Sequence, residues 1–179
     1  MKQNAAIKAL TSWDRKGRSV FRKSDLGIIF DETGRTLDQT LARLVKNGIL
    51  ERVAHGVYLY AHSRHIGYAT IEHIARNLRR GEITYESLES ALSQYGVISQ
   101  IPIDRVTLMT TGRSGEYDTP FGVIEFTHTK ANIGDILAGV LYREDHPLPI
   151  ASKQYAYANL RSTGRNLNMI DEEELHATD

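Results

Sequence analysis

The spacing of apolar residues over the first sixty positions predicts three short helices followed by two short strands. In residues 4–13 apolar side chains recur three and four positions apart, which is typical of one buried helix face. Ser24 is a candidate N-cap for a second helix. Thr36, with Gln39 three positions later, matches the capping box that begins a third helix, and Gly48 supplies its stop.

The third helix has the clearest two-sided pattern. Its expected buried stripe consists of Leu37, Leu41, Leu44 and Val45. At about 100° per residue, Gln39, Arg43 and Lys46 fall within roughly 40° of one another, on the side opposite to Leu37 and Leu44. One face is therefore suited to packing and the other to contact with a ligand.

Two short runs rich in β-branched and aromatic residues follow the third helix, at 49–53 and 57–60, and residues 54–56 join them as a hairpin. Three helices and a two-stranded hairpin within sixty residues indicate a winged helix-turn-helix. We assign this domain to residues 1–62, with a linker after it.

The second half of the chain contains elements of both kinds. In chain order they are helices over 70–80 and 84–95, strands over 105–111, 122–129 and 140–142, and a last helix capped by Ser152. The expected fold class is thus α+β: the winged helix, then a mixed α/β domain over 66–165 that contains an antiparallel hairpin. The acidic residues 166–179 are expected to form a flexible tail.

Composition narrows the possible functions. Hydrophobic residues make up 41% of the 179 and charged residues 25%, which is ordinary for a folded protein. The absence of cysteine excludes disulfides, Cys-ligated zinc, iron–sulfur clusters and thiol catalysis. No apolar run is long enough to span a membrane, and Lys8 interrupts the only N-terminal apolar segment. We expect a cytoplasmic protein that needs no cofactor and no metal.

The zero net charge conceals two oppositely charged halves. Residues 1–80 contain 15 Lys and Arg against 7 Asp and Glu, a net charge of +8, and residues 81–179 contain 7 against 15, a net charge of −8. A basic half that coincides with a winged helix favours binding to a polyanion. The alternative is a small helical domain whose polar face is merely solvated or contacts protein.

The residues expected to contact DNA are grouped by element. They are Arg22, Lys23 and Ser24 at the start of the second helix, Arg35, Thr36, Gln39, Arg43 and Lys46 on the third, and Arg52 and His55 on the hairpin. Gln can pair bidentately with adenine and Arg with guanine. A helix N-terminus, such as that carrying Arg35 and Thr36, favours a phosphate.

Several runs carry a family resemblance. They are residues 41–48 (LARLVKNG) and 52–60 (RVAHGVYLY) in the first domain, and 86–92 (ESLESAL), 96–98 (GVI), 107–114 (TLMTTGRS), 119–122 (TPFG) and 149–152 (PIAS) in the second. The first two resemble the winged helix of the AbiEi antitoxins of type IV toxin–antitoxin systems. The others, in this order, resemble the C-terminal region of that family, so the resemblance extends over about residues 5–160.

The resemblance implies a repressor that binds inverted repeats in the promoter of its own operon. It also implies a functional partner, a nucleotidyltransferase-like toxin involved in phage defence, with which no stable complex is required. We expect a monomer or a weak dimer in solution, paired on DNA. The alternative hypothesis is a non-enzymatic adaptor that binds and inhibits the toxin directly.

Other chemistries are weakly supported. Asp118, Glu125 and Lys130 resemble a metal-dependent nuclease site, but Thr127 stands where the lysine should follow the acid. His62 and His65, with His73 further along the chain, could ligate a metal, but two neutral histidines need a third donor and a second shell, and a basic linker beside a helix is the favoured interpretation. Ser114 lies in a Gly-rich turn that is not a nucleophile elbow, and no phosphate-binding loop is present. We therefore expect no enzymatic activity.

Overall fold

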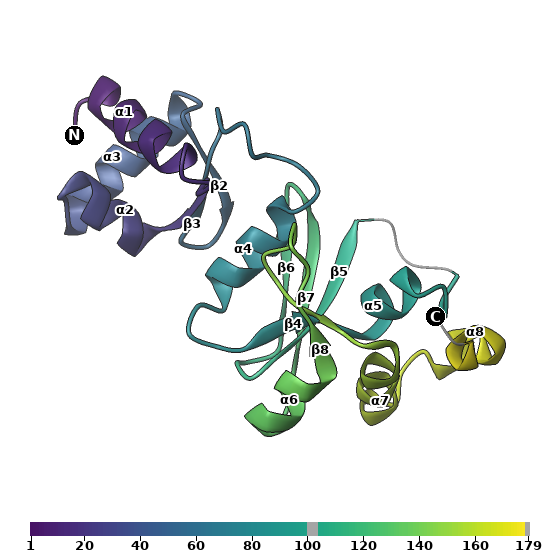
Figure 1. Ribbon diagram of the computed structural model, residues 1–179. Helices are drawn as coiled ribbons and strands as arrows, with labels where there is room; N and C mark the ends of the chain where they lie inside the picture. Colours follow the sequence, from purple (N-terminus) through teal and green to yellow (C-terminus); the bar gives the residue numbers. More distant parts are fainter. Residues whose placement is uncertain (100–103, 178–179) are drawn as a thin grey trace. The chain divides into compact units, whose positions relative to one another are not determined.

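The computed structural model describes residues 1–99 and 104–177, which divide into two compact units, Met1–Leu78 and Arg79–Asp179 (Figure 1). The boundary lies later than the expected linker after residue 62. Helix α4 (Thr70–Leu78), which we had expected in the second domain, contacts strands β1 and β3 and so belongs to the first unit.

The first unit is a winged helix-turn-helix. Besides α4, its elements are α1 (Gln3–Asp14), β1 (Val20–Arg22), α2 (Lys23–Phe30), α3 (Gly34–Lys46), β2 (Leu50–Ala54) and β3 (Val57–Tyr60). The strands form an antiparallel sheet in the order β1-β3-β2, with β2 and β3 as the wing. The helices enclose a core in which Leu10, Phe21, Leu26 and Leu44 are completely buried. Each contributes roughly 1.5–3 kcal/mol through burial.

Both predicted helix caps in this unit are wrong. Helix α2 begins at Lys23, and the Asp25 carboxylate accepts the Arg22 backbone N–H at 2.9 Å, so Ser24 lies inside the helix. Helix α3 begins at Gly34 after an extended Thr33, with no side-chain cap. Thr36 is consequently exposed within the first turn and caps nothing. Val45, expected in the buried stripe, is also exposed.

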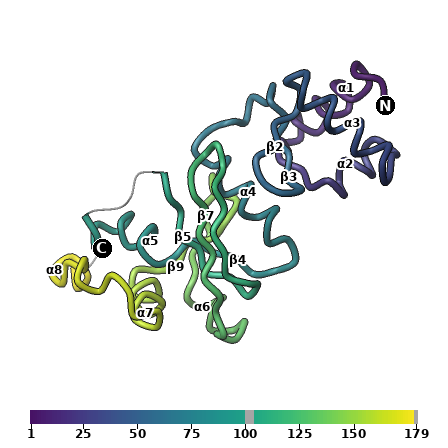
Figure 2. Tube along the Cα trace, turned by 180° about the vertical axis from the view of Figure 1, so that it is seen from behind, coloured from purple at the N-terminus to yellow at the C-terminus, as the bar shows by residue number. Residues whose placement is uncertain are grey.

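The second unit is built on a six-stranded mixed sheet. Its elements are β4 (Thr84–Glu86), α5 (Leu88–Gln94), β5 (Arg105–Thr110), β6 (Gly115–Thr119), β7 (Gly122–His128), α6 (Ile133–Gly139), β8 (Val140–Leu141), β9 (Ile150–Ala151), α7 (Lys153–Thr163), a 3-10 turn η1 (Leu167–Met169) and α8 (Glu172–His176). The strand order is β6-β7-β5-β4-β9-β8, of which β7, β5, β4 and β9 are labelled in Figure 2. The sheet contains an antiparallel hairpin, as expected, but β7 forms it with the unpredicted strand β6. Strand pairs β5–β7 and β4–β9 are parallel.

The helix predicted over 84–95 is two elements. Residues Thr84–Glu86 pair antiparallel with β5, and Leu88 then adopts φ +57° as the first residue of α5. Leu88 is completely buried, so packing holds it in a conformation that a leucine rarely adopts. Leu88 and Leu92 are spaced four positions apart, as in one continuous helix, so the sequence pattern did not reveal the break between β4 and α5. Helix α6 and strands β6 and β9 were not predicted either. Ser152 does cap α7, as expected, by accepting the Tyr155 backbone N–H.

The described part of the expected tail, residues 166–177, is packed against the second unit, and residues 178–179 lie outside the described residues. Leu175 is 1% exposed and belongs to the core of the second unit. Asp171 donates its backbone N–H to the Val97 carbonyl at 2.8 Å, and its carboxylate caps α8. The acidic composition suggested fraying, but Leu175 and the half-buried Ile170 supply enough apolar contact to hold the segment. Among the described residues, no helix is long and apolar enough to cross a membrane.

The half-buried His73 of α4 gives one testable pH effect. Burial, reinforced by Arg76, lowers the pKa of His73 below its ordinary value of 6.5. The unfolded chain therefore binds a proton at His73 more readily than the folded chain does. The resulting contribution to stability is present above pH 6.5 and is lost as the pH falls through the lower pKa of the folded state. His73→Asn should flatten this fall in pH-dependent denaturation of the first unit, followed by fluorescence of the single tryptophan, Trp13. The same change at the exposed His62 should leave the fall in stability at low pH unchanged. Equal pH curves for both variants would contradict the assignment of this fall to His73.

Candidate nucleic-acid interface

Helix α3 presents a continuous polar face to solvent. Its inner side is held by Leu37, Thr40, Leu41 and Leu44, all buried. Because the helix buries this side, the predicted residues on its other side are exposed: Arg35, Thr36, Gln39, Arg43 and Lys46. The structure thus places the five predicted α3 residues together on one accessible surface, which we call the α3 face.

A hollow lies beside the start of α2 and brings together four more of the predicted residues. Its volume is about 230 Å³, and its lining includes Arg22, Lys23, Ser24 and His55. Pairing of β1 with β3 places Arg22 opposite Val57, and the Lys23 backbone N–H donates to the Gly56 carbonyl at 2.9 Å. The wing turn is thereby fixed against the N-terminus of α2, although the two segments are thirty residues apart in the sequence.

The wing carries the remaining predicted residue, Arg52 on β2. Its guanidinium lies 3.1 Å from Nδ1 of His55, and both side chains are exposed. Gly56 takes φ +70° at the turn, a conformation that favours glycine. The turn therefore holds a cationic side chain and an imidazole at the tip of the hairpin.

Besides Arg52, three of the predicted cations have partners in the protein. Arg22 donates from Nε to the Asn77 carbonyl at 2.5 Å, at the end of α4. Lys23 forms an ion pair with Asp38 of α3. Arg43 donates to the Met1 carbonyl at 2.5 Å, in an exposed contact. Arg22 is therefore the least available for a ligand, because its partner lies in a half-buried setting, whereas Lys23 and Arg43 remain at the surface.

Sequence reasoning missed Ala42. It lies between Gln39 and Lys46 on the α3 face and is exposed. A methyl group at this place offers an apolar contact among polar ones, of the kind that fits the thymine methyl. Projecting every residue of the helix, and not only the polar ones, would have found it.

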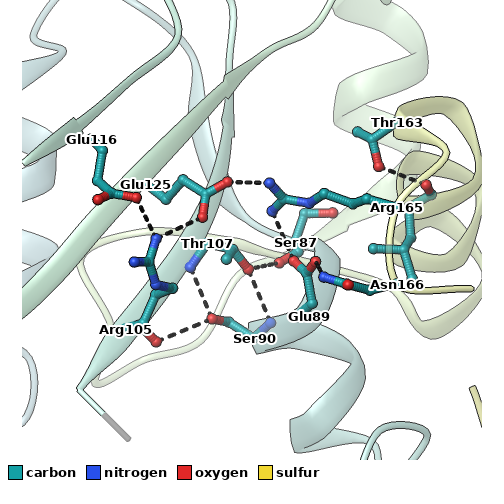
Figure 3. A network of polar contacts seen from close by, with 11 residues as sticks. Ser87, Glu89, Ser90, Arg105, Thr107, Glu116, Glu125, Thr163, Arg165 and Asn166 are labelled. Atoms are coloured by element: carbon teal, nitrogen blue, oxygen red, sulfur yellow. Dashed lines mark hydrogen bonds and ion pairs between the residues drawn. The ribbon is translucent and has the colours of Figure 1, made fainter. Parts of the chain in front are cut away.

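The second unit contains a network of ion pairs around Glu125, one of the three residues of the nuclease hypothesis (Figure 3). Glu125 on β7 accepts from Arg105 at 2.9 Å through one oxygen and pairs with Arg165 through the other. Arg165 also pairs with the buried Glu89 of α5 at 2.9 Å. Asn166 donates a further hydrogen bond to Glu89 at 2.7 Å. The arginines occupy the position between the carboxylates, so the arrangement is a structural ion network.

The other candidate residues do not form a reactive cluster. Among residues 1–99 and 104–177, no group of three His, Asp or Glu side chains could hold a metal. The Ser114 hydroxyl accepts the His128 backbone N–H at 2.8 Å. Lys130 is exposed after the end of β7, and Asp118 is exposed on β6.

Two comparisons with known proteins bear on this chain. A family model described as "Transcriptional regulator, AbiEi antitoxin" matches residues 8–61. A comparison with curated protein sequences finds no significant match. Among solved structures, the crystal structure of the RV2827C protein from Mycobacterium tuberculosis is similar, with a TM-score of 0.54 and 16% identity. That likeness covers 98% of this chain and 71% of the other, and shows a shared fold.

The family match covers α1 from residue 8, the helices α2 and α3, and the wing, which are the elements that carry the α3 face and most of the hollow. It confirms the family resemblance of the first domain, and the resemblance of the second domain stays a prediction. Residues 8–61 of this chain thus match the model of the AbiEi antitoxin family of transcriptional regulators.

Proposed function

We propose that this protein is a DNA-binding repressor of its own toxin–antitoxin operon and binds inverted repeats in the promoter. The observation that carries the proposal is the α3 face, where Arg35, Gln39, Arg43 and Lys46 are all exposed on the helix that a winged helix inserts into the major groove. An exposed cationic helix face suits the polyanionic ligand, and its Gln and Arg can read base edges.

The residues divide by role. Gln39 and Arg43 are placed to read bases, and Ala42 to contact a thymine methyl. Lys46 and Arg35 contact phosphates, which fix register without carrying sequence information. The hollow receives a backbone phosphate between Ser24 and His55, with Lys23 turning from Asp38 toward it. Arg52 on the wing contacts the adjoining part of the DNA backbone.

The C-terminal unit serves the antitoxin role in this proposal. It opposes a nucleotidyltransferase-like toxin without a stable complex, and the protein acts in the cytoplasm without catalysis or a cofactor. The buried Glu89 and the half-buried Glu125 support a structural role, since both are paired with arginine. Unit 2, Arg79–Asp179, has 9 Lys and Arg against 15 Asp and Glu, so we expect it to add no phosphate contacts.

The decisive experiment separates base reading from phosphate contact. Arg43→Ala should weaken binding to the gene's own upstream region by about 1–3 kcal/mol and relax the preference for one base pair. Lys46→Ala should weaken binding to all sequences about equally and reduce the salt slope by about one. Fluorescence anisotropy over a salt series, with matched and mismatched duplexes, measures both effects.

The matched control is Lys8→Ala, which removes an exposed cation from α1, away from the α3 face. It should leave affinity and salt slope nearly unchanged. If Lys8→Ala and Arg43→Ala had the same effect, binding would depend on overall charge, and the assignment of α3 as the reading helix would fail.

A further inference from the structure

The lining of the hollow beside α2 combines groups of opposite polarity. Lys23 and Ser24 at the N-terminus of α2, together with His55 of the wing turn, form a part that suits an anion. Asn77 and Leu78, the last two residues of α4, form another part. A helix C-terminus presents carbonyl oxygens that together carry roughly half a negative charge. An anion in the hollow would therefore be repelled by this helix end unless its charge is neutralised.

Arg22 supplies the neutralising charge. Its Nε donates to the Asn77 carbonyl at 2.5 Å, and its Nη2 lies 3.5 Å from the Leu78 carbonyl oxygen. Arg22 is the half-buried last residue of β1, and its pairing with Val57 of β3 places it in the lining of the hollow. One guanidinium thus contacts two successive carbonyls, and its charge offsets the partial charge of the helix end.

The same contact attaches the end of a short helix. Ile74 and Ala75 are completely buried and hold the middle of α4, which has nine residues. Helix termini fray when their last carbonyls lack donors. Because Arg22 fixes the last turn of α4 to β1, the lining of the hollow keeps one shape before a ligand arrives. A preformed lining lowers the entropic cost of binding.

We propose that Arg22 is a positioning residue of the hollow: it holds and neutralises the C-terminus of α4 and does not itself contact DNA. This inference rests on the proposed use of the hollow by a backbone phosphate. The sequence pattern grouped Arg22 with Lys23 and Ser24 as a DNA contact. A guanidinium that turned toward a phosphate would deprive both α4 carbonyls of a donor, so Arg22 acts through α4 while its two neighbours bind the phosphate.

The two cations at the start of α2 consequently differ in their tolerance of a conservative exchange. Arg22 serves two acceptors with the planar fork of a guanidinium, which a lysine cannot reproduce. Lys23 is expected to act on a phosphate as a point charge, and an arginine carries the same charge. Arg22→Lys should therefore impair the site without changing the net charge, whereas Lys23→Arg should leave it intact.

Fluorescence anisotropy of the full chain with matched and mismatched duplexes, over a salt series, tests this difference. Arg22→Lys should weaken binding to both duplexes by the same factor, about three- to tenfold, at an unchanged salt slope. Lys23→Arg should bind as the wild type does. Lys23→Gln should lower the salt slope by about 0.9, because it removes a phosphate contact. Arg22→Gln, the second variant at this position, should lower the slope by less than half of that amount.

Hydrogen exchange without DNA tests the structural cause. In Arg22→Lys the amides of the last turn of α4, residues 75–78, should exchange roughly fivefold faster than in the wild type. Exchange in the β2–β3 hairpin should stay unchanged, and Lys23→Arg should match the wild type in both segments. Denaturation followed by the fluorescence of Trp13 shows that each variant is folded.

Three results would overturn the proposal. They are wild-type DNA affinity in Arg22→Lys, unchanged exchange at the end of α4 in this variant, and a loss of affinity for the matched duplex alone, which would make Arg22 a base-reading residue. A wild type that binds no DNA would remove the proposed function as well. Full binding by Arg22→Lys would remove this inference only and leave the α3 face as the carrier of DNA binding.

Discussion

Replacement of Arg165 by methionine should lower the free energy of unfolding of the C-terminal unit by about 3–5 kcal/mol. The change leaves two carboxylates without their shared cation: Glu89, which is 8% exposed, and Glu125. A buried charge that loses its partner destabilises the fold, because neither water nor a protein group then compensates for its desolvation. Because Arg165 is partly exposed, solvent screens its ion pairs, and we expect a loss toward the lower end of this range.

Urea denaturation followed by far-UV circular dichroism measures this loss, because the only tryptophan lies in the first unit. Arg161→Met is the control, since Arg161 is exposed on α7, one turn before Arg165, and should cost less than about 0.5 kcal/mol. The double change Arg165→Met with Glu89→Gln should recover part of the loss. Equal effects of Arg161→Met and Arg165→Met would show that the network contributes nothing specific.

The second large effect is expected at Gly122. This glycine begins β7 with φ +114°, a conformation that side chains with a Cβ avoid. A Cβ there would lie 2.5 Å from the Asp104 carbonyl oxygen, which is backbone and cannot swing aside. Gly122→Ala should therefore destabilise the second unit by at least about 2 kcal/mol in the same denaturation measurement.

Gly115, in the same β6–β7 hairpin, is the matched control. Its φ is not in the left-handed region, and an added Cβ would meet the Tyr117 ring at 3.4 Å, an ordinary contact. Gly115→Ala should be nearly neutral or slightly stabilising. A similar loss at both glycines would mean that the hairpin tolerates no added methyl group, whatever the backbone conformation.

The fold of the first unit was largely predictable because its helices are amphipathic and its connections are short. The periodicity around Leu37, Leu41 and Leu44 located α3 and oriented its polar face. Helix starts were not predictable from Ser24 and Thr36. Local capping patterns compete with backbone pairing and with side chains such as Asp25, which only the folded chain brings into position.

The second unit was predicted less well because long-range contacts decide its local structure. Residues Thr84–Glu86 have a sequence compatible with a helix, yet they pair with β5 and β9 on either side. Tyr85 is completely buried between the layers, which outweighs local propensity. Strand β9 is two residues long, too short for any periodic signal, whereas β8 lies within the strand predicted over 140–142.

In the candidate site, too, local features were predictable from the sequence and features that depend on long-range contacts were not. The residues of the α3 face could be chosen from the sequence, since they depend only on helix geometry. The hollow could not, because it arises where β1 pairs with β3 and brings His55 to Lys23. The bond from Arg22 to the Asn77 carbonyl joins residues 55 positions apart and likewise leaves no local trace.

The strand order of the second unit also determines when each part of the protein can fold during synthesis. The last strand of the first unit ends at Tyr60 and its last helix at Leu78, so the winged helix is complete early. Strand β4, in contrast, lies inside the sheet and waits for β9 at Ile150–Ala151. Until the ribosome releases that segment, Tyr85 and Leu88 have no complete core to enter. A nascent chain therefore carries a finished winged helix ahead of an unfinished sheet, and premature termination before residue 150 would yield winged-helix domains attached to an aggregation-prone remnant.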